Sequence, residues 1–214
     1  MNYYIIIRGP LGCGKSTISE KLAKIIKAKY FAIDRVLDEG HFTLDEEDGY
    51  VSQNSFKKAN EVIAPKAMEV LKNNKPVIFD GNFYWQSQID DLIAKLDFPH
   101  YVFTLQAPLE LCIERDAQRD KPHGQDAAKA VYKKSTEFTY GTEIDVTKNL
   151  EQCIEEILSY LPKKKRKYMK KIILMLFAIP LLMGAACSQN KSIPSTDDST
   201  IEEKIITEEE EAFN

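Results

Sequence analysis

The stretch that decides the fold is Gly9-Pro10-Leu11-Gly12-Cys13-Gly14-Lys15-Ser16-Thr17. An apolar run at residues 3–8 precedes it, and residues 18–26, with apolar side chains at helical spacing, follow it. A buried strand, a glycine-rich loop and an amphipathic helix are therefore predicted in that order. The spacing G-x-x-x-x-G-K-S is that of the Walker A loop, for which this strand and helix are the required context. An ordinary glycine-rich turn before a helix is the competing interpretation.

The loop has the composition of a phosphate-binding site. Successive backbone N–H groups and a helix N-terminus surround phosphate oxygens with partial positive charge, and glycine removes the Cβ that would block their approach. Lys15 is expected to reach the β- and γ-phosphates of ATP, and the Ser16 hydroxyl to bind Mg²⁺. The residues expected to bind the nucleotide are Gly9, Gly12, Cys13, Gly14, Lys15, Ser16 and Thr17.

The composition narrows the class of protein. The chain has 214 residues, which suffices for one α/β domain with some length to spare. Its 29 Lys and Arg against 33 Asp and Glu give a net charge of −4, which disfavours a nucleic-acid partner. The four cysteines have no C-x-x-C spacing and form no metal-binding pattern with the histidines, so a cytoplasmic location is expected. The chain begins directly with a strand pattern, so no N-terminal export signal is expected.

Strand and helix patterns alternate about five times within residues 1–162, which predicts an α/β fold with helices on both faces of a parallel sheet. After the first helix, strands are expected at residues 29–33, 76–82, 100–105 and 143–147, and helices at 53–73, 86–96, from 108, 127–138 and 150–161. Pro65 predicts a kink or break in the longest helix. The acidic residues 38–49 show little periodicity and predict a mobile flap or a short helix.

Two carboxylates stand where strands of the predicted sheet end, and such ends meet at the ligand crevice of a parallel sheet. Asp34 follows the second strand, and it could accept the proton of a substrate hydroxyl as that hydroxyl attacks phosphorus. Its alternative role is to cap the next segment. Asp80 ends an apolar strand in the manner of a Walker B carboxylate and is expected to hold Mg²⁺. The alternative there is an Asx turn before Gly81.

Arg115 and Arg119 lie one helical turn apart, just before a loop that contains Pro122 and Gly124. Guanidinium groups in this position could close over ATP, neutralise charge on the transferring phosphoryl group and exclude water. A solvated helix face, with Glu114 and Asp116 nearby, is the competing interpretation.

The segment after Asp80 is a candidate acceptor pocket. Asn82, Tyr84 and Trp85 follow the strand directly and could line such a pocket, although the aromatic side chains could equally belong to the core. Guanine-nucleotide proteins are disfavoured, because the sequence has no N-K-x-D motif and no D-x-x-G after the third strand. The long insertions of large ATPase machines do not fit in about 160 residues.

The order GPLGCGKST, AIDR, VIFDGN, L-x-x-C-x-x-R-x-x-x-R and EIDVT resembles the small P-loop kinase group. Shikimate and gluconate kinases, adenylylsulfate kinase, polynucleotide 5′-hydroxyl kinase domains and zeta-toxin-like kinases, often labelled "AAA family ATPase", share this arrangement. The resemblance covers residues 1 to about 161, and the Walker A loop is its most specific motif. Shikimate itself is disfavoured as a substrate, because only Gly81 stands where shikimate kinases have three glycines.

The resemblance implies a three-layer P-loop fold with a five-stranded parallel sheet of order 2-3-1-4-5. It implies an ATP- and Mg²⁺-dependent transfer of the γ-phosphate to a hydroxyl of a small molecule. In that group the strand-two aspartate is the base, which corresponds to Asp34, and lid arginines correspond to Arg115 and Arg119. The loop near Thr147 would border the adenine. A polynucleotide or nucleotide-sugar kinase, and an ATP-binding switch with slow hydrolysis, are the alternatives.

The remaining residues change character. A basic linker at 163–171 leads to a hydrophobic segment at 172–187, and a polar and acidic tail at 188–214 is expected to be disordered. From Met169 this part resembles the start of a bacterial lipoprotein with Cys187 as the lipidated residue, although Gly184 stands where leucine is preferred. Two joined reading frames, a membrane anchor and a helix packed on the domain are the competing interpretations. Membrane association is expected only through residues 172–187, and few contacts with residues 1–162 are expected.

Overall fold

A computed structural model of the chain describes residues 2–39 and 45–162. The predicted basic linker, hydrophobic segment and acidic tail at residues 163–214 therefore lie outside the described residues. No helix within the two described ranges combines the length and the apolar composition needed to cross a bilayer.

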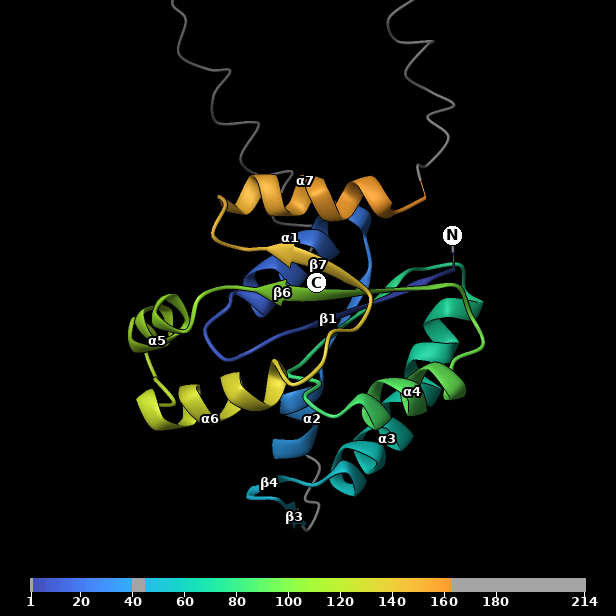
Figure 1. Ribbon diagram of the computed structural model, residues 1–214. Helices are drawn as coiled ribbons and strands as arrows, with labels where there is room; N and C mark the ends of the chain where they lie inside the picture. Colours follow the sequence, from blue (N-terminus) through green and yellow to red (C-terminus); the bar gives the residue numbers. More distant parts are fainter. Residues whose placement is uncertain (1, 40–44, 163–214) are drawn as a thin grey trace, which may run out of the picture. The chain divides into compact units, whose positions relative to one another are not determined.

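A five-stranded sheet forms the centre of the molecule (Figure 1). Neighbouring strands run parallel throughout, in the order β2-β5-β1-β6-β7. Counted without the short hairpin strands β3 and β4, this is the predicted order 2-3-1-4-5, so that prediction is confirmed. The strands are β1 (Tyr4–Arg8), β2 (Lys29–Ala32), β5 (Val77–Asp80), β6 (His100–Gln106) and β7 (Thr142–Asp145).

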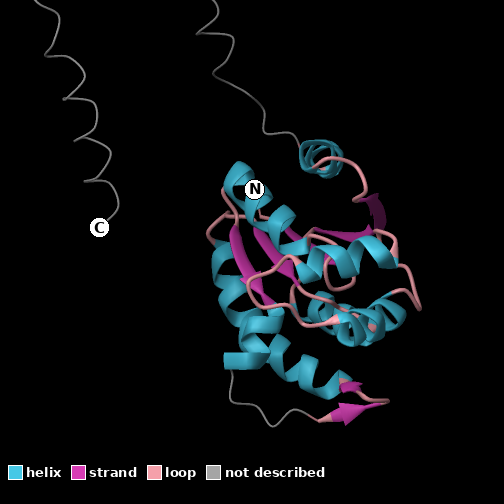
Figure 2. Ribbon diagram, turned by 90° about the vertical axis from the view of Figure 1, so that its left-hand side faces the viewer, coloured by secondary structure: helices cyan, strands magenta, loops and turns pink. Residues whose placement is uncertain are grey.

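Helices cover both faces of the sheet, as Figures 1 and 2 show. Successive side chains of β1 point to opposite faces, so Ile5 and Ile7 pack with α1 and α7, whereas Tyr4 and Ile6 pack with α3 and α4. This produces the three layers that the sequence predicts. The helices are α1 (Lys15–Ile26), α2 (Ile33–Glu39), α3 (Gln53–Lys72), α4 (Gln86–Lys95), α5 (Leu109–Ala117), α6 (Gln125–Ser135) and α7 (Leu150–Tyr160).

A kink or break was predicted at Pro65, and the break is wrong, because helix α3 is continuous through this residue. The helix runs for 20 residues from Gln53, and the side chain of its N-cap residue Ser52 accepts a hydrogen bond from the backbone N–H of Ser55. Ile63, Ala64 and Ala67 are buried around the proline. Tertiary packing of this apolar face holds the helix together across the hydrogen bond that proline cannot make.

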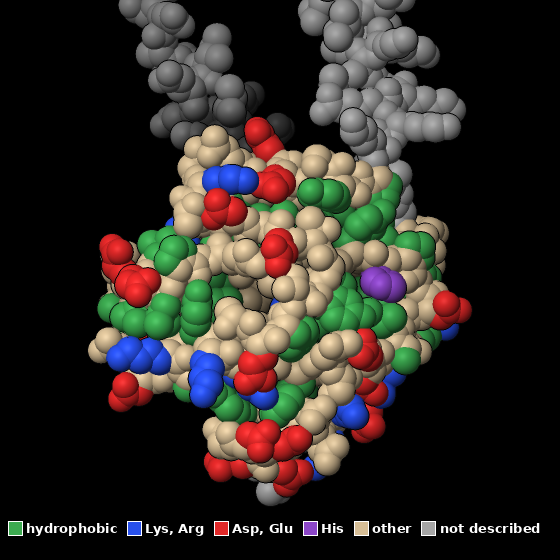
Figure 3. Space-filling model, in the orientation of Figure 1, with side chains coloured by type: hydrophobic (Ala, Val, Ile, Leu, Met, Phe, Trp, Pro, Cys, Tyr) green, Lys and Arg blue, Asp and Glu red, His purple; other side chains and the backbone are tan. Residues whose placement is uncertain are grey.

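The acidic residues 38–49, predicted to form a mobile flap or a short helix, are described only in part. Helix α2 follows β2 directly and buries Ile33. Beyond the undescribed residues 40–44, β3 (Glu46–Glu47) and β4 (Tyr50–Val51) form an antiparallel hairpin. Acidic side chains gather at this end of the molecule (Figure 3). Asp34 consequently lies in the first turn of α2 and not at a strand end.

Candidate active site

The glycine-rich loop joins β1 to α1 and packs tightly against α5. Gly12 has a φ of 78°, and a Cβ at this position would lie 2.0 Å from the carbonyl oxygen of Cys112. Gly14 precedes α1 with a φ of 92°, a conformation that side chains disfavour. Helix α1 begins directly after Gly14, so its first backbone N–H groups lie next to the loop. N–H groups at a helix N-terminus can bind an anion such as phosphate.

Lys15 lies over the loop and is linked to the predicted base through one side chain. Its ammonium group donates hydrogen bonds to the Pro10 carbonyl oxygen (2.8 Å) and to Asn82 Oδ1 (3.0 Å). The amide nitrogen of Asn82 donates in turn to Asp34 Oδ2 (3.3 Å). The structure therefore brings together the phosphate loop, the segment after β5 and the first turn of α2. Asn82 was expected only as a lining residue, and its bridging position could not be read from the sequence.

Asp80 is 4% exposed and is held by a neighbouring strand. The hydroxyl of Tyr30, in β2, donates a 2.7 Å hydrogen bond to Asp80 Oδ2, while Asp80 Oδ1 has no hydrogen-bond partner among the described residues. Burial raises the pKa of Tyr30, the charge of Asp80 raises it further, and a hydrogen bond with Ser16 acts in the opposite direction. Ser16, Tyr30 and Asp80 thus share one neighbourhood.

This neighbourhood fits a magnesium ion. Mg²⁺ prefers oxygen ligands and usually keeps several waters, with one or two carboxylates and substrate phosphates completing its shell. Asp80 Oδ1 is a buried carboxylate oxygen that accepts no hydrogen bond from the described residues. The hydroxyl of Ser16 lies in the same neighbourhood. Within the described ranges, no group of three or more His, Cys, Asp or Glu side chains could bind a metal by itself. The ligands present could therefore hold Mg²⁺ together with phosphate oxygens and water.

Arg115 and Arg119 line one cavity with the phosphate loop. The cavity has a volume of about 330 Å³, and Gly12, Gly14 and Thr17 form its loop side. The Arg115 guanidinium donates a 3.1 Å hydrogen bond to the carbonyl oxygen of Val146, which precedes Thr147. Val146 and Lys148 border this cavity. The loop expected to border the adenine therefore lies beside both predicted lid arginines, and the Thr147 side chain itself lines a different cavity.

The loop after α5 is folded around Asp116, a buried residue. The backbone N–H groups of His123 and Gly124 donate to Asp116 Oδ2 at 3.0 and 3.1 Å, and Arg119 lies 3.5 Å from Asp116 Oδ1. Burial opposes ionisation of Asp116, but these hydrogen bonds and the nearby charges outweigh it, so its pKa lies below the ordinary value. Asp116 is therefore a buried, ionised group that holds this loop in place, whereas the side chain of Arg119 is 39% exposed.

Both aromatic residues after β5 are core residues, and one of them, Tyr84, is also a neighbour of Asp34. Tyr84 and Trp85 are buried and donate hydrogen bonds to the carbonyl oxygen of Val51 at 3.4 and 2.8 Å. The Tyr84 ring also packs edge to face with Phe56 at 5.2 Å. Burial raises the pKa of Tyr84, and the charge of Asp34 adds to the increase. Tyr84 therefore lies close enough to Asp34 to sense its charge.

Arg8 is a buried cation beneath the phosphate loop that the sequence reasoning missed. Its guanidinium donates to the carbonyl oxygens of Phe83 (3.2 Å), Ser135 (2.7 Å) and Phe138 (3.1 Å) and to the Thr104 hydroxyl (3.2 Å). Burial lowers its pKa to about 10. One signal could have identified it, because Arg8 is a lone charge at the end of the predicted buried strand.

Lys134 was also missed. This buried lysine lies 4.0 Å from the centre of the Trp85 ring and forms a 2.6 Å ion pair with Glu137. It extends from α6 toward the segment that carries Asn82. Its position depends on the packing of α6, and the pattern of residues 127–138 gives no sign of it.

The chain was compared with protein families, with curated proteins and with solved structures. A family model described as an AAA domain matches residues 5–140. No curated protein matches the chain. The resemblance to small P-loop kinases predicted from the sequence is confirmed by this match and by the solved structures described next.

Three solved structures illustrate the likeness of fold. A gluconokinase from Sinorhizobium meliloti 1021 has a TM-score of 0.56 and 16% identity, over 74% of this chain and 90% of that one. A sugar kinase from Janibacter sp. HTCC2649 has a TM-score of 0.62 and 16% identity, over 75% and 94%. The Mycobacterium tuberculosis APS kinase, in complex with AMPPNP and APS, has a TM-score of 0.55 and 14% identity, over 74% and 96%.

Proposed function

The chain belongs to the AAA domain family, and on that premise we propose that it is an ATP- and Mg²⁺-dependent kinase. Its reaction is the transfer of the γ-phosphate of ATP to a hydroxyl group of a small molecule. The observation that carries this proposal is the hydrogen-bonded connection from Lys15 through Asn82 to Asp34. It places a carboxylate next to the residue that would bind the γ-phosphate.

Lys15 and the loop amides bind the phosphates of ATP. Lys15 exchanges its contacts with Pro10 and Asn82 for the β- and γ-phosphate oxygens when the nucleotide enters. Asn82 then remains beside Asp34 and can orient the acceptor. Ser16 and Asp80 would hold Mg²⁺, which when bound supplies charge neutralisation at the phosphates.

Asp34 acts as the base. The acceptor oxygen forms a bond to the γ-phosphorus while the bond between the γ-phosphorus and the bridging oxygen breaks, and ADP leaves with that oxygen. The proton of the acceptor hydroxyl passes to the Asp34 carboxylate. Tyr84, whose hydroxyl donates to the Val51 carbonyl oxygen, lies close to this carboxylate.

Arg115 and Arg119 act on the nucleotide side. Their cavity adjoins Gly14 and Thr17, so a base and ribose placed there leave the phosphates at the loop. Their positive charges offset the negative charge of the phosphoryl group during transfer. Closure of this end excludes water, which would otherwise hydrolyse ATP.

The test is γ-phosphate transfer to a panel of sugars, nucleosides and 5′-hydroxyl oligonucleotides. We expect Asp34→Asn to lower kcat for the best acceptor by roughly 10²- to 10⁴-fold, while the Kd for ATP stays within about twofold. The matched control, Asp97→Asn at an exposed position, should behave like the wild type. Slow ATP hydrolysis that no acceptor stimulates and that Asp34→Asn leaves unchanged would instead identify an ATP-binding switch.

A further inference from the structure

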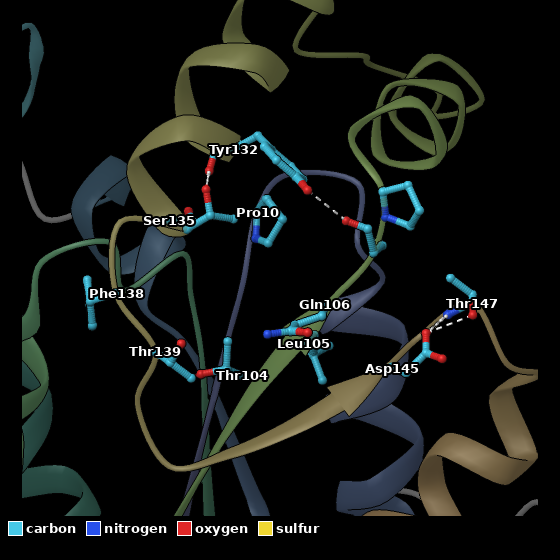
Figure 4. A pocket seen from close by; sticks show the side chains of 13 residues that line it. Pro10, Thr104, Leu105, Gln106, Tyr132, Ser135, Phe138, Thr139, Asp145 and Thr147 are labelled. Carbon is cyan, nitrogen blue, oxygen red and sulfur yellow. Dashed lines mark hydrogen bonds between the residues drawn. The ribbon is translucent and has the colours of Figure 1, made fainter.

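A second cavity borders the phosphate loop on the side of Pro10. It has a volume of about 480 Å³ and lies between α6 and the carboxyl ends of β6 and β7 (Figure 4). Small-molecule sites usually have volumes of about 300–1,000 Å³. Lys15, Asp34 and both lid arginines are absent from the described residues that line it. It is therefore separate from the proposed phosphoryl-transfer site.

The cavity is lined by apolar rings and by hydrogen-bonding groups. Pro10 and Pro108 supply apolar rings, and Tyr132 reaches across from α6, with its hydroxyl donating a 3.2 Å hydrogen bond to the Ala107 carbonyl oxygen (Figure 4). Gln106 supplies an amide group. Such surfaces can contact the faces of a ring while polar groups bind its edge.

Ser135 is a lining residue of this cavity whose hydroxyl group makes no hydrogen bond to the described residues. The residue is only 2% exposed. Buried hydroxyl groups are nearly always hydrogen-bonded, because an unpaired one costs about 1–3 kcal/mol. Because the hydroxyl oxygen is itself almost inaccessible, a ligand in the cavity could supply the missing partner once the Ser135 side chain rotates toward it.

The charge of the lining disfavours an anion. Asp145 is the one charged residue among the described residues of the lining. Hydrogen bonds from the Thr147 hydroxyl and backbone N–H lower the pKa of Asp145, which keeps it ionised near neutral pH. Arg8 lies behind the wall, where it binds the carbonyl oxygens of Ser135 and Phe138. A phosphate group would therefore meet a carboxylate and no available cation.

We propose that this cavity is a second binding site, for an uncharged ring compound of nucleoside or glycoside size with several O–H or N–H donors. Its ring contacts Pro10, Pro108 and Tyr132. Its donors bind Asp145 and the Gln106 side-chain oxygen, and one of its polar atoms pairs with the Ser135 hydroxyl. Nucleosides and glycosides share this chemistry.

The test is binding to the full chain, saturated with AMPPNP so that the nucleotide cavity is filled. The probes are adenosine, cytidine, methyl glucoside and trehalose, measured one at a time by titration calorimetry and by saturation-transfer NMR. Binding of at least one probe in the presence of AMPPNP is expected. Failure of all four to bind, or loss of binding when AMPPNP is added, would overturn the proposal. Phosphoryl transfer is not measured, so the result is independent of the proposed kinase function.

Two variants locate the site. Thr139→Trp fills the cavity from an exposed position and should abolish binding, whereas Ser159→Trp, on the exposed side of α7, should leave it unchanged. Ser135→Ala removes the unpaired hydroxyl and should weaken binding by roughly 2- to 10-fold without unfolding the chain. Binding that survives both Thr139→Trp and Ser135→Ala lies elsewhere and overturns the proposal.

Discussion

The Tyr30 hydroxyl and the Asp80 carboxylate are joined by a 2.7 Å hydrogen bond between adjacent strands of the sheet. This bond fixes one carboxylate oxygen of Asp80 and leaves the other, Oδ1, without a partner among the described residues. A buried carboxylate in this state is stabilised by its single donor and is available to a cation on its other side.

Tyr30→Phe should weaken both the fold and the response to magnesium. Tyr30 is the one residue in the described part of the chain that donates to the buried Asp80 carboxylate, so its loss is expected to lower the free energy of unfolding by about 1–3 kcal/mol. Loss of the group that orients a metal ligand should raise the Mg²⁺ concentration for half-maximal transfer by roughly 10- to 100-fold. Urea unfolding and a magnesium titration measure these effects. Tyr160→Phe, at an exposed tyrosine, is the control. Equal effects of the two variants would contradict the role of Tyr30 as the residue that orients Asp80 for magnesium.

Gly12→Ala should prevent folding or cost more than about 4 kcal/mol, because its Cβ would lie 2.0 Å from the backbone oxygen of Cys112. Gly124→Ala is the matched comparison. It has a φ of 94°, and no described atom lies within 4 Å of its added Cβ, so it should cost only the backbone strain of about 1–3 kcal/mol. Thermal unfolding of both variants shows which is the more destabilised, and similar losses of stability in both would contradict the prediction.

Asp116→Asn should destabilise the protein at neutral pH and much less in acid. The pKa of Asp116 in the folded chain lies below its ordinary value of 3.8, so its ionised form stabilises the fold above that pH. This contribution disappears as the pH falls through the lowered pKa. The difference in unfolding free energy between wild type and variant, measured in urea, should be about 1–3 kcal/mol at pH 7 and should shrink below pH ~4.

Asp120→Asn, at an exposed position in the same loop, serves as the control for Asp116→Asn. It should leave the unfolding free energy nearly unchanged at each pH. A difference for Asp116→Asn that grows as the pH falls would contradict the direction assigned to its pKa.

A chain ending at Pro162 should fold and transfer phosphate as the full chain does. Within the described residues, two hydrophobic clusters with members between Tyr3 and Leu161 form the core. Equal midpoints of urea unfolding and equal kcat for the two chains are the expected results. Precipitation or loss of activity in the shorter chain would show that residues 163–214 support the catalytic domain.

The strands and the phosphate loop could be predicted because local patterns specify them, whereas the order of the strands followed from the resemblance to small P-loop kinases. The apolar runs before Gly9 and around Ile78 mark buried strands, and the spacing from Gly9 to Ser16 allows few other structures. Asp34 lies in a helix and not at a strand end, but because α2 begins where β2 ends it is still joined to Lys15 of the phosphate loop through Asn82.

The features that the sequence did not predict depend on contacts between segments that are distant along the chain. The hairpin at Glu46–Glu47 has too few residues for a readable alternation, and the packing of Ile63 and Ala67 carries α3 through Pro65. Tyr30 and Asp80 are 50 residues apart in sequence and meet only because β2 and β5 pair. A single sequence contains no signal for such a pair.

The buried guanidinium of Arg8 makes folding of the site cooperative. Its partners, from Phe83 to Phe138, are separated from it by 75 to 130 residues and come from three different segments. Release of any one segment would leave part of a buried cation without hydrogen bonds, at a cost that opposes partial opening. The strand that leads into the phosphate loop, the acceptor-side segment and the end of α6 should therefore lose protection from hydrogen exchange together, as one unit.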